Sequence, residues 1–222
     1  MRALVRGPAF VAVLGGAVLG ALVLRARYGP SPRLLRARVR WVHRASPYLL
    51  RSLGITERSP ERIPVREAGM TVANHISYVD VLLIAAALPT VFVTSTEVRD
   101  TPGLGFLCRM AGCAFVDRRS ARGLRGEIAA LASVVRSGVH VAVFPEATST
   151  RGDRVLPFKA ALFEAARLSG RPLRAAVVEY DANVLPHISY AGDDRFLPHL
   201  VRLLGSRSTN AQVRWVAVDA AP

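Results

Sequence analysis

The sequence predicts an α/β protein, with a layered domain whose largely parallel central sheet is flanked by helices, preceded by an N-terminal helical region that associates with membranes. Three observations predict this. Short apolar runs alternate with amphipathic patterns from residue 57 onward, residues 7–24 carry no charge, and residues 1–56 hold ten arginines but no acidic residue. We therefore expect a membrane anchor in residues 1–56 and a globular domain in residues 57–222.

The first element expected is an apolar helix over residues 7–24. Its 18 residues reach only the lower end of what a bilayer-spanning helix needs. A basic start is also typical of a signal peptide, but Arg25 and Arg27 follow where a cleavage region would be expected. The segment therefore predicts a retained anchor, which either crosses the bilayer or enters it part of the way.

The second element expected is an amphipathic helix over residues 31–53. Its apolar stripe is Leu35, Val39, Val42, Leu49 and Leu53. The opposite face is cationic through Arg33, Arg36, Arg40, Arg44 and Arg51, while Arg38 lies near the edge of the stripe. Such a helix is typical of one lying on an anionic membrane, although a helix packed on the domain with a solvated basic face has the same pattern. Pro47 favours a break into two pieces.

The remaining elements alternate along the chain. Strands are predicted at residues 70–73, 91–94, 113–116, 139–144 and 174–180, and helices at residues 81–88, 124–135 and 160–168. Gly138 and Gly170 follow the last two helices and fit as their terminators. Strands that alternate with helices predict a largely parallel sheet.

The net charge of +14 suggests three kinds of partner, namely nucleic acid, an anionic membrane or a phosphorylated substrate. Residues 57–222 hold 20 basic against 16 acidic residues, which leaves only +4 for the domain. No aromatic residues are interleaved with its basic ones, so we expect no nucleic-acid partner. Two cysteines, Cys108 and Cys113, are too few for a disulfide framework or a Cys-only zinc site, and we expect a reducing compartment.

The first candidate for chemistry lies after a predicted strand, in residues 73–80. His75 with a nearby carboxylate, Asp80, is a minimal general base, because the carboxylate fixes the imidazole and stabilises its charged form. On an unbroken helix the two would point about 140° apart. They can meet if His75 lies in the turn before the helix, with Ser77 as the N-cap. Alternatively, Ser77 and Asp80 form only a capping box.

Two further stretches end in polar residues. Residues 139–151 form a strand followed by a loop rich in hydroxyl groups, where Glu146 is positioned to accept hydrogen bonds from a polyol. The same residues also read as an ordinary turn. Residues 112–119 form a strand closed by Asp117 and two arginines, of which Arg118 suits a phosphate. Arginines at a strand end are also commonly just solvated.

In their order along the chain, these stretches resemble the motifs of the lysophospholipid acyltransferase family, which includes bacterial 1-acylglycerol-3-phosphate acyltransferases. The first motif matches Asn74, His75 and Asp80, the second Phe115, Val116, Asp117 and Arg118, and the third Phe144, Pro145, Glu146 and Thr148. Pro157, Phe158 and Lys159 resemble a further stretch of the family. The resemblance extends over about residues 65–180, and the ordered combination is far more specific than any single motif.

The resemblance implies a membrane-bound acyltransferase whose acyltransferase domain is residues 57–222. Its catalytic residues would be His75 and Asp80. Its acceptor-binding residues would be Asn74, Arg118, Glu146, Thr148 and Arg151. It implies no metal and no cofactor beyond the co-substrate, which is acyl-CoA or acyl carrier protein. The partners would be membrane lipids and a lysophospholipid acceptor, foremost 1-acylglycerol-3-phosphate in phospholipid biosynthesis. Basic residues concentrated after residue 24 place the domain on the cytoplasmic face.

The sequence departs from the family pattern in the region that would hold phosphate. Ala147 replaces the usual Gly, Ser149 stands where many members carry Arg, and Ser95 and Thr96 lie where relatives often have Lys. Two phosphate contacts are therefore missing. An alternative acceptor is a phosphate-free lysolipid, such as an aminoacyl lipid or a glycolipid. A further alternative is an inactive membrane scaffold of the same fold.

Overall fold

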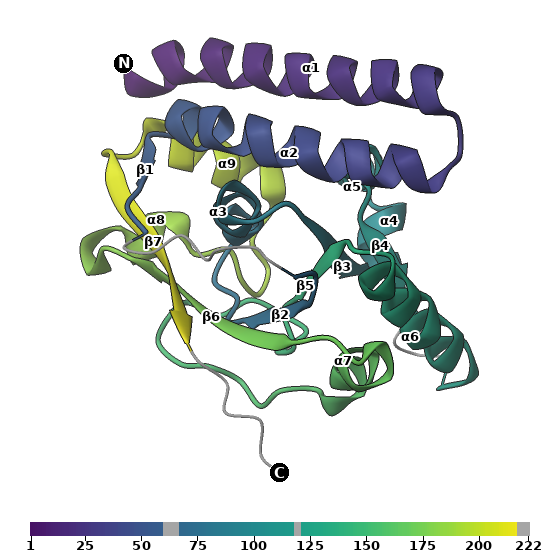
Figure 1. Cartoon of the computed structure of the whole chain (residues 1–222). Helices are drawn as coiled ribbons and strands as arrows, with labels where there is room; N and C mark the ends of the chain where they lie inside the picture. Colours follow the sequence, from purple (N-terminus) through teal and green to yellow (C-terminus); the bar gives the residue numbers. More distant parts are fainter. Residues whose placement is uncertain (60–66, 118–120, 217–222) are drawn as a thin grey trace.

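The computed structural model describes residues 1–59, 67–117 and 121–216. A seven-stranded sheet, in the order β1-β7-β6-β2-β5-β3-β4, lies at the centre with helices on both faces, and a two-helix hairpin covers one side (Figure 1). Every strand pair is parallel except β6 with β7, which is antiparallel. The predicted fold class, a layered α/β domain with a largely parallel sheet, is confirmed.

The hairpin consists of α1 (Arg2–Tyr28) and α2 (Pro32–Leu53). Ser31 caps α2, because its hydroxyl accepts a hydrogen bond from the Leu34 amide at 3.3 Å. Contrary to the predicted break, α2 continues through Pro47. A proline removes one helical hydrogen bond, and the turns that follow are held by Leu49, Leu50 and Leu53, which are buried against the domain.

The two faces of α2 divide as the sequence predicted. All five arginines of the cationic face are exposed on the outside of the helix, namely Arg33, Arg36, Arg40, Arg44 and Arg51. Val39, Leu49 and Leu53 of the apolar stripe are buried in the core of the domain. The stripe therefore contacts protein, and within the hairpin most of the exposed apolar side chains belong to α1.

The α1 helix packs along α2 and the domain. The indole of Trp41 donates a hydrogen bond to the Ala17 carbonyl at 2.8 Å, and Gly20 lies against its ring. Near the start of α1, the Arg6 guanidinium donates to the Ser206 carbonyl at 2.9 Å. The outward face carries exposed apolar side chains: Leu4, Val5, Val11, Leu19 and Val23. By length and composition α1 could cross a membrane.

The strands are short and mostly buried. They are β1 (Ile55–Glu57), β2 (Met70–Ala73), β3 (Thr90–Ser95), β4 (Ala114–Val116), β5 (His140–Val143), β6 (Leu173–Tyr180) and β7 (Thr209–Val216). All the residues of β2 and β5 are buried, which agrees with their central place in the sheet. The expected boundary between residues 56 and 57 falls inside β1.

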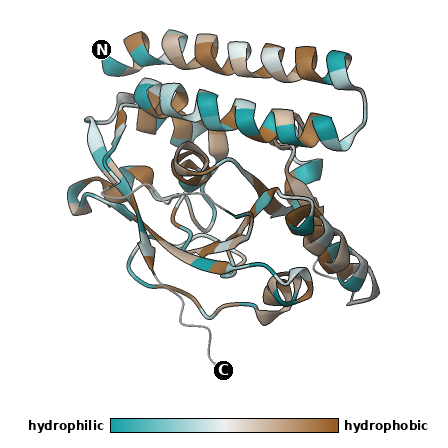
Figure 2. Ribbon diagram, viewed as in Figure 1, coloured by the Kyte–Doolittle hydropathy of each residue, from teal (hydrophilic) through white to brown (hydrophobic). Residues whose placement is uncertain are grey.

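Helices cover both faces of the sheet (Figure 1). They are α3 (Val79–Ala87), α4 (Thr96–Asp100), α5 (Leu104–Ala111), α6 (Ala121–Arg136), α7 (Phe163–Ser169), α8 (Leu185–Ile188) and α9 (Phe196–Gly205), with 3₁₀ turns at Ala160–Leu162 and Ala182–Val184. One core cluster joins α2, α3 and α9 to the sheet, and a second joins α6 and α7 to the opposite face. The central α3 is mostly hydrophobic (Figure 2), with Asp80 in its first turn.

The elements predicted from residue 70 onward are confirmed, with ends shifted by a few residues. The strands β1 and β7 and the helices α4, α5, α8 and α9 were not predicted. In β7 the buried positions are Thr209, Ala211 and Val213, alternating with Asn210, Gln212 and Arg214. Small and polar residues on the inward face give this strand a weak apolar signal.

Candidate active site

His75 and Asp80 meet in the loop between β2 and α3. The chain leaves the sheet after Ala73 and does not become helical until Val79, so His75 lies in the turn. Its Nδ1 atom lies 2.8 Å from the Asp80 Oδ2 atom. Asp80 is fully buried and the His75 side chain is 21% exposed. The two residues therefore form a buried acid paired with a reachable imidazole.

The Asp80 carboxylate accepts from several donors. Its Oδ2 atom also accepts the amides of Ile76 at 2.6 Å and Ser77 at 2.9 Å. In return, the Ser77 hydroxyl accepts from the Val79 amide at 3.4 Å. The Asp80 carboxylate therefore accepts the two amides ahead of α3 and lies beside His75 at the same time. Ser77 was expected as the N-cap, but α3 begins at Val79 with Tyr78 as its N-cap.

Tyr180, at the end of β6, completes the surroundings of Asp80. Its hydroxyl donates a short hydrogen bond to the Asp80 Oδ1 atom. Burial, followed by the charge of Asp80, raises the pKa of the Tyr180 hydroxyl well above its ordinary value. The phenol therefore remains a donor, and both carboxylate oxygens of Asp80 are engaged.

These contacts define the protonation pattern of His75. An ionised carboxylate only accepts hydrogen bonds, so the neutral imidazole donates from Nδ1 and keeps its lone pair on Nε2. Phe144 stacks on the imidazole with ring centroids 4.0 Å apart and 14° between the planes. Asp80 therefore holds the Nδ1 edge of the His75 ring and Phe144 covers one of its faces, with Nε2 as the basic atom.

The third motif holds this loop in place. Glu146 is 3% exposed; its Oε1 atom accepts the His75 amide at 2.7 Å and its Oε2 atom accepts the Leu156 amide at 2.7 Å. The Thr150 amide donates to the His75 carbonyl at 2.9 Å. Glu146 was expected to bind the acceptor, and the structure gives each of its oxygens a backbone partner within the protein.

Asn74 also contacts backbone. Its side-chain amide donates to the Val178 carbonyl at 3.0 Å and its side-chain oxygen accepts the Val178 amide at 2.7 Å. The pair lies just beyond the last β2–β6 register pair, Ala73 with Ala176. Asn74, expected to bind the acceptor, thus extends the β2–β6 contact and fixes the direction in which the chain leaves the sheet.

The other expected acceptor residues differ in surroundings. Thr148 is exposed at the tip of its loop. Arg151 donates to Asp194 at 2.6 Å and to the Ala191 carbonyl at 2.9 Å. The Ser149 hydroxyl donates to the Tyr190 carbonyl. Arg118 lies outside the described residues. The loop and the segment around residue 190 are therefore held together by Ser149 and Arg151.

The backbone at Ala147 has a φ of 66°, in the left-handed region. A side chain in this conformation costs roughly 1–2 kcal/mol, and glycine adopts it without that cost. This is the position where the resemblance leads one to expect Gly. The turn keeps the glycine geometry although the residue is alanine.

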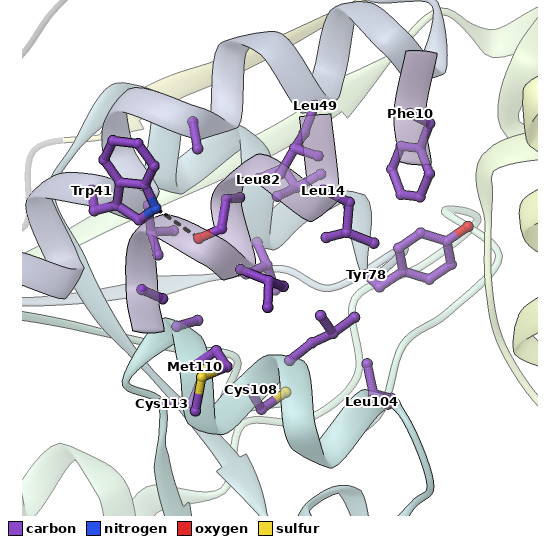
Figure 3. A pocket seen from close by; sticks show the side chains of 18 of the residues that line it. Phe10, Leu14, Trp41, Leu49, Tyr78, Leu82, Leu104, Cys108, Met110 and Cys113 are labelled. Atoms are coloured by element: carbon purple, nitrogen blue, oxygen red, sulfur yellow. Dashed lines mark hydrogen bonds between the residues drawn. The ribbon is translucent and has the colours of Figure 1, made fainter. Parts of the chain in front are cut away.

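An apolar pocket of about 250 Å³ lies between the hairpin and the domain (Figure 3). Phe10, Leu14, Trp41 and Leu49 line it from α1 and α2. Side chains from α3, α5 and α9 and their flanking segments complete the wall, among them Leu82, Leu104, Cys108, Met110, Cys113 and Leu200. Tyr78, three residues after His75, is also part of this wall. The pocket can hold an alkyl chain, because its lining is almost wholly apolar.

Within the described ranges no three His, Cys, Asp or Glu side chains gather as a metal site would require. Sequence reasoning missed Tyr180 and the stacking role of Phe144. Tyr180 could have been identified from its position at the end of a predicted strand, because ligands in α/β proteins bind near the carboxyl ends of the parallel strands. The pocket, assembled from five helices and their flanking segments, left no local signal.

A family model described as Acyltransferase matches residues 54–187. A lyso-ornithine lipid O-acyltransferase of Rhodobacter capsulatus is 35% identical over 64% of this chain and 53% of its own length. A lyso-ornithine lipid O-acyltransferase of Pseudomonas aeruginosa is 32% identical over 72% of this chain and 59% of its own length. A 1-acyl-sn-glycerol-3-phosphate acyltransferase of Neisseria gonorrhoeae is 34% identical over 50% and 44%. The chain thus spans about half the length of these relatives.

The fold is similar to a solved structure, the 1-acyl-sn-glycerophosphate acyltransferase of Thermotoga maritima. The TM-score is 0.63 over 97% of this chain and 86% of the other, with 21% sequence identity. At this identity the similarity concerns the fold.

Proposed function

We propose that this chain, which belongs to the acyltransferase family, transfers a fatty acyl group from an acyl thioester to the free hydroxyl of a lysolipid. The observation that carries the proposal is the Nδ1–Oδ2 distance of 2.8 Å between His75 and a fully buried Asp80. A general base held in one tautomer beside an apolar pocket suits the acylation of a lipid alcohol.

In the proposed reaction, His75 Nε2 removes the proton of the acceptor hydroxyl as its oxygen attacks the thioester carbonyl. Asp80 stabilises the imidazolium that forms. Collapse of the tetrahedral intermediate breaks the carbon–sulfur bond, and the proton on His75 leaves with the thiol. Acyl-CoA or acyl carrier protein would be the donor. Tyr180, Glu146 and Asn74 act here as positioning residues, since their contacts are to Asp80 or to backbone.

We propose that the apolar pocket takes an acyl chain. Tyr78 lines the pocket and lies only three residues after His75 in the sequence. The same ligand can therefore place its acyl chain in the pocket and its reacting carbonyl near His75. We further propose that the hairpin lies in the membrane interface, with the exposed apolar face of α1 towards lipid and the domain on the cytoplasmic face. Packing of α1 along α2 and the bond of Arg6 to Ser206 favour this over a spanning helix.

Substitution of the base tests the catalytic proposal. General-base help is worth about 10²–10⁴ in rate, so His75→Ala should lower kcat by that factor. His187, exposed on α8, offers a matched control, and His187→Ala should retain the parent rate. Labelled acyl-CoA and a lysolipid in detergent give the rates, and circular dichroism checks folding. Equal rates for His75→Ala and the parent would reject the mechanism and favour an inactive scaffold.

For the acceptor, we propose an aminoacyl lysolipid of the lyso-ornithine type ahead of 1-acylglycerol-3-phosphate. A phosphate monoester needs cationic donors that are not already committed. Arg151 is engaged with Asp194, Ser149 replaces an arginine, and Arg99 is paired with Asp100. Relatives named lyso-ornithine lipid O-acyltransferase also align with more of this chain than the Neisseria enzyme does. This ranking reverses the one that the sequence motifs suggested.

An acceptor panel separates the two. The full chain, supplied with labelled acyl-CoA, should acylate lyso-ornithine lipid at a higher kcat/KM than 1-acylglycerol-3-phosphate. The opposite order would restore the phosphate acceptor. The His75→Ala variant run on the same panel identifies background acylation, so that failure of the acceptor ranking is distinguished from failure of the acyl-transfer mechanism.

A further inference from the structure

The two cysteines of the chain occupy partner positions in one helix-terminal motif. Helix α5 ends at Ala111 and is capped by Gly112, whose φ of 83° is left-handed, and the Cys113 amide donates to the Cys108 carbonyl at 3.0 Å. This six-residue closure, with a second bond from the Gly112 amide to the Arg109 carbonyl, is a Schellman motif. Its two outer side chains ordinarily touch. Here those outer side chains are the thiols of Cys108 and Cys113.

Both thiols line the apolar pocket, next to Met110 (Figure 3). Each cysteine is free and partly exposed, so a small molecule in the pocket can reach both. The proposed acyl transfer uses neither thiol. The pair is therefore a nucleophilic group in the wall of a cavity, and its chemistry is independent of the His75 site.

The two thiols are not equivalent. A hydrogen bond from the Cys113 thiol lowers the pKa of Cys108, and the charge of Arg109 adds to this. The same thiol–thiol bond, followed by burial, raises the pKa of Cys113. Cys108 is therefore the thiol that ionises first, with Cys113 as its neighbouring thiol. A low-pKa cysteine beside a second one is the arrangement of redox-responsive pairs.

We propose that Cys108 and Cys113 form a dithiol site that hydroperoxides oxidise to an intramolecular disulfide in the wall of the apolar pocket. The Cys108 thiolate attacks the O–O bond and takes the distal oxygen, which gives a sulfenic acid and releases an alcohol, or water from hydrogen peroxide. The Cys113 sulfur then displaces hydroxide from that sulfenic acid, which forms the S–S bond and releases water. The hydroperoxide accepts the two electrons, and a dithiol reductant reverses the change.

The surroundings favour an apolar oxidant and an intramolecular product. A hydroperoxide on an alkyl chain can enter a pocket with this lining more readily than a charged oxidant can. A disulfide requires Cα atoms about 4.4–6.8 Å apart, and the backbone bond of 3.0 Å from the Cys113 amide to the Cys108 carbonyl already brings the two residues together. The disulfide would tie the end of α5 to the residue preceding β4.

The test exposes the full chain in detergent to cumene hydroperoxide, blocks free thiols with N-ethylmaleimide and measures the intact mass. We expect a species that has lost two hydrogen atoms and takes up no maleimide, and whose two thiols return with dithiothreitol. Peptide mapping should join Cys108 to Cys113. A covalent dimer would overturn the proposal. So would two thiols that still react with N-ethylmaleimide after an exposure that oxidises free glutathione.

Single variants test the order of the steps. In Cys113→Ser, oxidation should stop at a sulfenic acid on Cys108 that dimedone traps. In Cys108→Ser, Cys113 should be trapped about tenfold more slowly, because the burial that also raises the pKa of Cys113 remains and the thiolate is the reacting form. Equal trapping in the two folded variants, or faster trapping of Cys113, would contradict the assignment of Cys108 as the first nucleophile. The same variants unfolded in urea should react alike, which shows that any difference comes from the fold.

Discussion

Asp80 is the residue on which the site is organised. Its carboxylate accepts the Ile76 and Ser77 amides, faces His75 Nδ1 and accepts the Tyr180 hydroxyl. Three of these groups lie within five residues of Asp80 in sequence. Tyr180 lies 100 residues away, and is brought to Asp80 because β2 and β6 are neighbours in the sheet.

Removal of the Tyr180 hydroxyl should change the pH profile of the enzyme. Without this donor, more negative charge remains on Asp80, which favours the imidazolium form of His75. In Tyr180→Phe we expect the acid limb of the kcat/KM profile to move to higher pH. The rate at neutral pH should fall about tenfold, the equivalent of one hydrogen bond worth about 1.4 kcal/mol.

Tyr78→Phe is the matched control for Tyr180→Phe. The Tyr78 hydroxyl bonds His199 at 3.0 Å and does not contact Asp80, so its loss should leave the acid limb in place. The same shift in both variants would mean that the effect is structural and that Tyr180 does not act through Asp80.

At Ala147, substitution by glycine should stabilise the protein. The residue has a φ of 66°, so glycine removes a strain of roughly 1–2 kcal/mol, and the greater entropy of the unfolded chain offsets part of that gain. We expect the free energy of unfolding, from urea titration, to rise by about 0.5–1 kcal/mol. Ala129→Gly, on the exposed face of α6, should lower it by about 1 kcal/mol. If Ala147→Gly and Ala129→Gly both lowered the stability, the backbone at Ala147 would not be strained.

The site was predictable from the sequence only where its parts are local. His75, Asp80 and Ser77 lie within one turn-and-helix segment, and the expected pairing of His75 with Asp80 is present, whereas the N-cap is Tyr78 and not Ser77. Glu146 was recognised as important, but the sequence could not tell that its carboxylate faces the amides of His75 and Leu156. Such partners depend on how separate loops meet in the folded protein. A glutamate in a motif looks the same in the sequence whether its carboxylate binds substrate or backbone amides.

Among the elements, the α1–α2 hairpin shapes the apolar pocket. Its helices meet where Gly20 faces the Trp41 ring, so closely that a Cβ atom at Gly20 would overlap the indole. The glycine allows the indole to reach the Ala17 carbonyl on the same stretch of α1 (Figure 3). The contact between the two helices therefore depends on the absence of a side chain at one position.

Gly20→Ala should weaken this contact. The added methyl group displaces the indole, so we expect a loss of about 1–3 kcal/mol in stability and a change in tryptophan fluorescence. Gly16, one turn earlier on α1, provides the control, because a Cβ atom added there would meet nothing within 4 Å. Gly16→Ala should be neutral or stabilise α1 by up to about 1 kcal/mol. Equal effects of the two substitutions would show that helix propensity alone is being measured.

The sequence predicted the elements that have strong periodicity. The sheet strands from β2 to β6 were predicted from apolar runs, because both faces of the central ones are buried. It did not predict β1, which has three residues, or β7, whose inward residues include only one large apolar side chain, Val213, beside Thr209 and Ala211. These two strands owe their conformation to the partners they pair with, and that information is not local.

At the scale of the whole molecule, the hairpin combines positive charge with exposed apolar surface. The outward arginines of α2 and the exposed apolar residues of α1 belong to the same hairpin, while α6 and α7 lie on the opposite face of the sheet (Figure 1). The sequence predicted a basic anchor. The structure adds that the apolar stripe of α2 is used within the protein.

The hairpin arginines should govern binding to anionic vesicles. Each basic residue near such a surface is worth about 1 kcal/mol, so the double variant Arg40→Gln/Arg44→Gln should bind about thirtyfold more weakly at low salt. The control Arg125→Gln/Arg167→Gln removes equal charge from α6 and α7 and should bind like the parent. Vesicle flotation at rising salt measures this, and the difference should shrink as screening increases. Equal losses in both variants would indicate a response to net charge only.

The pairing of β1 with β7 also determines the order in which the molecule can be completed during synthesis. Ile55 pairs with Thr209, and Arg6 bonds Ser206, so both contacts need residues made long after the hairpin. At about 5–20 residues per second, β1 waits for roughly 8–30 seconds before its partner leaves the ribosome. The hairpin, with its exposed apolar face, is therefore synthesised while the sheet that it will cover is still incomplete.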